Sequence, residues 1–122
     1  VRRPPRPRVE WIAPRRGLAA ELSQATVAVV GGGVSLYEAC AAGVPAVSVP
    51  VVRAQVPTVR AFGRRGAAVT LPFPAAPTQA AAKVVALLRS PSKQAALSRR
   101  SMRVVDGRGA ARAAAAVLHL AR

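Results

Sequence analysis

The sequence predicts an α/β fold, in which a parallel sheet is flanked by helices. Four short runs rich in valine, isoleucine or alanine alternate with segments whose apolar residues recur at helical spacing. That alternation favours parallel strands joined by right-handed crossovers through helices. The chain of 122 residues is 52% hydrophobic, largely through alanine and valine. Such small side chains suit helices that pack closely on a sheet.

The N-terminal part is expected to contain a linker, a strand and a helix. Residues 1–8 are rich in arginine and proline and are interpreted as a linker or a truncated start. Residues 9–122 are expected to form one α/β domain. Residues 9–12 predict a short strand that closes at Ala13-Pro14, and residues 17–24 show helical spacing. Because the chain begins with Val1 close to this strand, we expect it to be a piece of a longer protein.

The middle of the chain predicts two strands around a helix. Residues 26–30 are an apolar, valine-rich run typical of a buried strand. Residues 34–42 follow as a helix that ends at Gly43, a residue suited to the left-handed position after a helix. Residues 45–49 form the next strand, since proline is tolerated at the first position of a strand and Pro50 closes it.

The remaining elements are one strand and four helices. A helix over residues 56–65 begins around Pro57 and stops at Gly66, and residues 67–71 predict a strand. After a loop over residues 72–77, three helices follow, over residues 78–89, from residue 92 to about 103, and over residues 110–121. Their expected N-terminal caps are Thr78, Ser92 and Asp106.

The most informative feature is the glycine run Gly31-Gly32-Gly33 between a strand and a helix. A helix N-terminus attracts phosphate, because its first N–H groups lack partners within the helix and the helix dipole is positive there. Glycines let a ligand approach the backbone. Glu38 lies one turn further along, roughly 5 Å along the helix axis, where its carboxylate is placed to accept hydrogen bonds from sugar hydroxyls. An ordinary tight turn with a solvated Glu38 is the alternative interpretation.

Composition excludes several classes of function. The formal charge of +15 suggests nucleic acid, but no aromatic residues interleave with the arginines, which favours a solvated basic surface. A basic nucleic-acid-binding module is kept as an alternative.

No stretch reaches the ~20 apolar residues of a membrane span and no signal peptide is visible, so we expect a cytoplasmic protein. The single Cys40 excludes an internal disulfide and is expected in the core, and His119 is expected to serve packing or the surface.

The spacing of the glycine run and the residues after it resembles a known signature. The stretch from Gly32 to Glu38, followed by Gly43-Val44-Pro45, Pro50 and Gln55, is similar to the donor-binding signature in the C-terminal half of GT-B nucleotide-sugar enzymes. Residues 55–57, 66–69 and 106–112 resemble most the pseudaminic-acid-pathway nucleotide-sugar hydrolases and the related spore-coat polysaccharide proteins. The resemblance implies a Rossmann-like domain that binds a UDP-sugar, in an enzyme of glycosyl transfer or hydrolysis.

The resemblance also implies roles for single residues. The amides from Gly32 to Ser35, which include Gly33 and Val34, would hold the diphosphate, and Gly31 belongs to the same turn. Glu38 would bind the ribose hydroxyls, Ile12 and Ala13 would meet the uracil, and Gln55 would touch the sugar. In such enzymes the catalytic base lies in an N-terminal domain that this chain lacks. We therefore expect the fragment to bind without turnover, with no catalytic residue, metal or cofactor of its own.

The partners expected from the resemblance are the UDP-sugar, the missing N-terminal GT-B domain, and an acceptor at a membrane surface or linked to a lipid. A noncatalytic remnant of the family is the remaining alternative.

Overall fold

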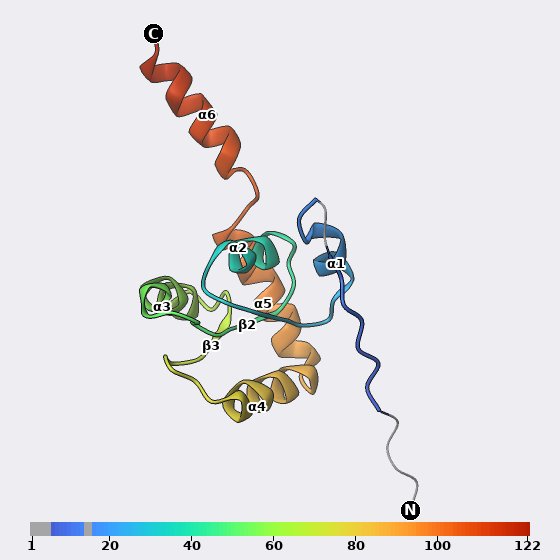
Figure 1. Ribbon diagram of the computed structural model, residues 1–122. Helices are drawn as coiled ribbons and strands as arrows, with labels where there is room; N and C mark the ends of the chain where they lie inside the picture. The colour runs from blue at the N-terminus through green and yellow to red at the C-terminus, as the bar shows by residue number, and fades with distance from the viewer. Residues whose placement is uncertain (1–5, 14–15) are drawn as a thin grey trace, which may run out of the picture.

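The computed structural model describes residues 6–13 and 16–122 and has an α/β architecture (Figure 1). Three parallel strands, β1 (Ala28–Val30), β2 (Ala46–Ser48) and β3 (Val69–Thr70), form a sheet in the order β1-β2-β3. Val47 lies opposite Val29 on one side and Val69 on the other. A parallel sheet flanked by helices confirms the predicted fold class and is consistent with a Rossmann-like fold.

Six α-helices and one 3₁₀ helix are present in the described ranges. The predicted helices are confirmed to within two residues at each end. They are α1 (Ala19–Gln24), α2 (Val34–Ala41), α3 (Val56–Arg64), α4 (Pro77–Leu88), α5 (Pro91–Val104) and α6 (Gly109–Leu120), with the 3₁₀ helix η1 (Arg53–Gln55) directly before α3.

Helices cover both faces of the sheet, and two apolar clusters result (Figure 1). Ala46 of β2 belongs to the first cluster, which includes Leu36 of α2 and Phe62 of α3. Val47 points to the opposite face and packs with Leu87 of α4, in a cluster that α5 also joins. All three residues of β2 are therefore buried, as a central parallel strand requires.

Helix α2 ends as the sequence predicts. Gly43 has φ 71°, a left-handed conformation that other residues rarely adopt, so the turn requires glycine for its conformation. Cys40 on the same helix is fully buried, as expected, and burial raises the pKa of its thiol to about 11.

The strand expected over residues 9–12 is wrong. These residues have no regular secondary structure, and Trp11 is 94% exposed. A strand needs a neighbour for its backbone hydrogen bonds, and in the described part of the chain the sheet consists of β1, β2 and β3 alone. Ala13 is likewise exposed, whereas Pro14, which was expected to close this strand, lies outside the described residues together with most of the expected linker.

The three expected helix caps are also corrected. Helix α4 begins with Pro77 at its first position, and the Ala76 N–H donates to Oε1 of Gln79 at 2.7 Å, so Thr78 lies inside the helix. For α5 the capping residue is Ser90 instead of Ser92, since the Ser90 hydroxyl accepts from the Lys93 N–H at 3.3 Å. In both cases a proline occupies the first position of the helix, and the cap lies two residues before the expected one.

Asp106 holds the loop before α6 but is not its capping residue, which is Arg108. The Asp106 carboxylate accepts from the Arg108 N–H at 2.9 Å and from Arg112 at 2.7 Å. These hydrogen bonds, with Arg112 the larger cause, lower the pKa of Asp106 to about 2.

Helix α6 extends away from the rest of the molecule and is exposed along its whole length, including His119 (Figure 1). No helix in the described ranges is both long enough and apolar enough to cross a bilayer.

Candidate functional site

The glycine turn joins β1 to α2 at the carboxyl end of the sheet, where open α/β sheets bind their ligands. Gly33 is the N-terminal cap of α2 and has no side-chain capping bond. The Leu36 N–H donates to the Gly33 carbonyl at 3.1 Å. Among the described residues, no acceptor lies within hydrogen-bond geometry of the N–H groups of Gly33, Val34 and Ser35. Three donors at a positive helix end are therefore open to an anion.

Gly32 is buried beneath the residues that lead into α3. Its N–H donates to Oε1 of Gln55 at 3.1 Å, and the Val51 N–H donates to the same oxygen at 2.9 Å. A Cβ on Gly32 would lie 2.6 Å from Cγ2 of Val59 and 2.8 Å from Cβ of Gln55. Only glycine fits here, because α3 packs directly on the turn. The Gly32 amide is thus already used within the protein, and the open amides begin at Gly33.

Gln55 has a second group that faces the turn. Its side-chain oxygen Oε1 accepts two backbone N–H groups, those of Gly32 and Val51. The side-chain nitrogen Nε2 lies 3.7 Å from where a Cβ on Gly33 would lie. Nε2 has no acceptor among the described residues. The side chain therefore both braces the turn and presents an amide donor beside the open N–H groups.

Ser48 is a structural residue of the site that the sequence analysis did not identify. It is fully buried at the end of β2, and its hydroxyl donates to the Gly31 carbonyl at 3.0 Å. This bond ties the first glycine of the turn to the neighbouring strand. A lone hydroxyl residue in an otherwise apolar strand was the available signal.

Glu38 lies one turn into α2 and is half-buried. Its Oε1 is 3.6 Å from where a Cβ on Gly17 would lie, so the carboxylate sits beside the loop that precedes α1. No ion pair involves Glu38 in the described part of the chain. The structure thus places the open amides, Ser35 and Glu38 along the first two turns of one helix, with Gln55 beside them.

Ile12 and Ala13 are not brought to the turn by any hydrogen bond within the described ranges; both are exposed in irregular chain. Over those same ranges, no three histidine, cysteine or acidic side chains gather as a metal site requires. Ligand binding by the expected site residues stays a prediction.

The chain is similar to a protein of known role. Over 66 residues, 54% of this chain, it is 38% identical to the spore coat polysaccharide biosynthesis protein SpsG of Bacillus subtilis (strain 168). The chain spans about a fifth of that relative's length, since the match covers 20% of it. No family model and no solved structure matches the chain. The similarity supports in part the resemblance to the spore-coat polysaccharide group seen in the sequence.

Proposed function

We propose that this chain is the nucleotide-sugar-binding part of an enzyme of cell-surface polysaccharide biosynthesis, with the architecture of the C-terminal half of a GT-B glycosyltransferase or nucleotide-sugar hydrolase. The observation that carries the proposal is the set of open N–H groups at Gly33, Val34 and Ser35, with Glu38 one turn along the same helix. The similarity to SpsG supports the biosynthetic context.

The proposed ligand is UDP bearing a sugar. The open amides and the Ser35 hydroxyl hold its diphosphate, because a helix N-terminus combines free donors with a positive dipole. Glu38 lies about one helical turn, ~5 Å, beyond them and accepts hydrogen bonds from the two ribose hydroxyls. Charge-assisted bonds of this kind contribute about 1.5–3 kcal/mol. Nε2 of Gln55 donates to the sugar, and the backbone near Ile12 and Ala13 meets the uracil.

The chain binds the donor without turning it over. Its four acidic residues are spread along the sequence and its one histidine lies on α6, far along the chain from the glycine turn. The general base belongs to an N-terminal GT-B domain, and the acceptor lies at a membrane surface or is linked to a lipid. The site of action is the cytoplasm.

Isothermal titration of the 122-residue chain with UDP tests the proposal. Glu38→Gln is expected to weaken UDP binding ~10- to 100-fold, because a neutral amide replaces the carboxylate at the ribose. Glu21→Gln is the matched control: it removes the same charge from the neighbouring helix α1 and should leave the affinity within about twofold.

A second ligand isolates the ribose contact. UDP lacking both ribose hydroxyls should bind wild-type protein and Glu38→Gln equally. Equal affinity of the two proteins for UDP itself would remove the ribose role of Glu38. The absence of UDP binding by the wild-type chain, together with DNA binding that falls steeply with salt and ignores Glu38, would favour the nucleic-acid alternative.

A further inference from the structure

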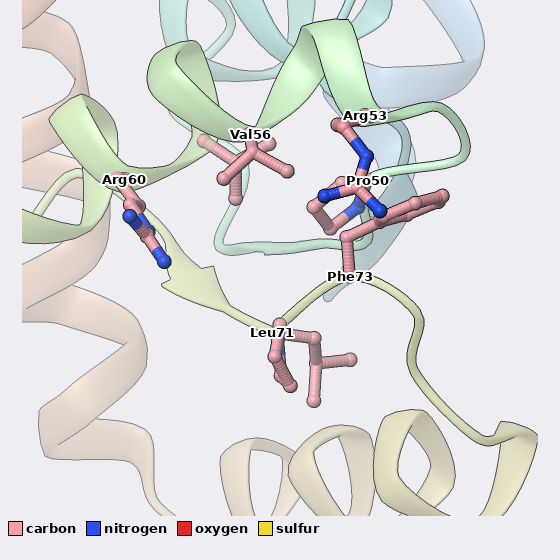
Figure 2. Close-up of a pocket in the computed structure, with 8 residues that line it drawn as sticks. Pro50, Arg53, Val56, Arg60, Leu71 and Phe73 are labelled. Atoms are coloured by element: carbon pink, nitrogen blue, oxygen red, sulfur yellow. The ribbon is translucent and has the colours of Figure 1, made fainter.

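A hollow opens at the carboxyl edge of the sheet, between α3 and the chain that follows β3 (Figure 2). Its volume is about 270 Å³. The walls are Arg53, Val56, Val59 and Arg60 from η1 and α3, with Leu71 and Phe73 from the chain after β3 and two prolines. Val59 lies between this hollow and the glycine turn, because it lines the hollow and also contacts the position of Gly32.

Sequence spacing explains how two arginines come to flank this hollow. Arg53, Val56 and Arg60 stand at positions i, i+3 and i+7 of one helical segment, so they share a face. Figure 2 shows the two arginines on either side of Val56, with Leu71 opposite. Leu71 and Phe73 reach the same edge because β3 runs parallel to β2 and both strands end there.

Both charged residues that line the hollow are arginines. The Arg53 guanidinium lies 5.8 Å from the centre of the Phe73 ring, a cation–π distance that orients it at one end of the hollow. Neither Arg53 nor Arg60 has an ion-pair partner among the described residues, and no acidic residue lines the walls. Two unneutralised guanidinium groups thus face one small space with apolar walls.

We infer that this hollow binds a phosphate monoester or diphosphate group. A guanidinium presents paired N–H donors that match phosphate oxygens, and two positive charges balance a dianion better than a single carboxylate. Pockets for whole drug-sized ligands span roughly 300–1,000 Å³, so this smaller hollow fits a diphosphate group, or one phosphate group with the first carbons attached to it. Leu71 and Phe73 pack against those carbons. The inference does not depend on UDP binding at the glycine turn.

Nuclear magnetic resonance locates the binding directly. The Nε–H resonances of Arg53 and Arg60 are followed in the 122-residue chain while inorganic pyrophosphate is added, with and without UDP. Both resonances should shift and saturate, whereas that of Arg64, on the same helix but outside the hollow, should stay in place. Equal shifts at all three arginines would show an unspecific effect of charge and overturn the inference.

Substitutions provide the second readout. Arg53→Gln and Arg60→Gln are each expected to weaken pyrophosphate binding at these resonances about tenfold, because each removes charge-assisted hydrogen bonds. Arg64→Gln removes the same charge from α3 and should change the affinity less than about twofold. An equal loss of pyrophosphate affinity in Arg64→Gln and Arg60→Gln would show that general charge, and not this hollow, binds the ligand, and would contradict the inference.

Two further ligands distinguish the source of the phosphate. Tighter binding of geranyl phosphate than of inorganic phosphate assigns the site to a phosphate carried on a lipid, and equal affinities assign it to a free phosphate. If pyrophosphate and geranyl phosphate both leave Arg53 and Arg60 unmoved, the inference fails. Shifts of the Gly33 to Ser35 amides on addition of UDP report binding at the glycine turn separately. Each of the two proposals can therefore be refuted without the other.

Discussion

Substituting Gly32 by alanine tests whether α3 packs directly on the glycine turn. The added Cβ would lie 2.6 Å from Cγ2 of Val59, 2.8 Å from Cβ of Gln55 and 3.2 Å from the Gln55 carbonyl oxygen. Two of these neighbours are atoms at or next to the backbone of the η1–α3 segment, so they move only if the segment itself moves. The substitution therefore strains the packing between two elements.

The expected magnitude follows from three terms. Overpacking a tight site costs typically 1–3 kcal/mol. Displacing Gln55 weakens its bond to the buried Gly32 N–H, which contributes about 0.5–1.5 kcal/mol. Alanine returns about 0.4–1 kcal/mol by reducing the entropy of the unfolded chain. Together these terms lower the free energy of unfolding by about 0.5–4 kcal/mol, with a central value of about 2 kcal/mol, against a typical total of 5–15 kcal/mol.

Urea denaturation followed by circular dichroism measures this loss. Gly33→Ala is the matched control, because the nearest atom to its added Cβ is Nε2 of Gln55 at 3.7 Å, an ordinary contact. Its free energy of unfolding should change by less than about 1 kcal/mol. A Gly32→Ala protein as stable as the wild type, or as stable as Gly33→Ala, would refute the packing of α3 on the turn.

Two further predictions concern titratable groups outside the site. The buried Cys40 thiol, whose pKa is raised to about 11, should react with Ellman's reagent at pH 8 only after unfolding in urea; reaction of the folded chain at the rate of a free thiol would contradict its burial. Asp106, whose pKa is lowered from 3.8 to about 2, should keep its contacts to Arg108 and Arg112 above about pH 4 and lose them as the pH falls towards 2. A carbon-13 titration of its carboxyl measures this, and Arg112→Gln should move the midpoint back up; an ordinary midpoint in the wild type would contradict the ion pair.

Local patterns predicted most of the fold. Helical spacing and Gly43 located α2 to within one residue, because an α-helix and its glycine terminator depend on residues a few positions apart. The strand expected at residues 9–12 failed for the opposite reason: a strand is completed by a partner that may be distant in sequence, and β1 is an edge of the described sheet. The caps of α4 and α5 differ from the expected ones because Pro77 and Pro91 occupy the first helical positions, where a missing N–H costs nothing, so each cap is the residue before the proline.

The candidate site was predicted in its parts more than in its connections. The glycines form the turn before α2 and Glu38 lies on α2 itself, so their relative placement follows from the sequence. The bonds of Gln55 to Gly32 and of Ser48 to Gly31 span 23 and 17 residues, and no local pattern reports them. The same holds for the hollow between Arg53 and Phe73, which needs β2 and β3 to be side by side.

Amide chemical shifts of the 122-residue chain during a UDP titration test the central claim most directly. The N–H resonances of Gly33, Val34 and Ser35 should move together with a single dissociation constant, while that of Gly32, already bonded to Gln55, should move less. If UDP leaves the chemical shifts of these three amides unchanged, or shifts only resonances of residues elsewhere, the start of α2 does not bind the diphosphate.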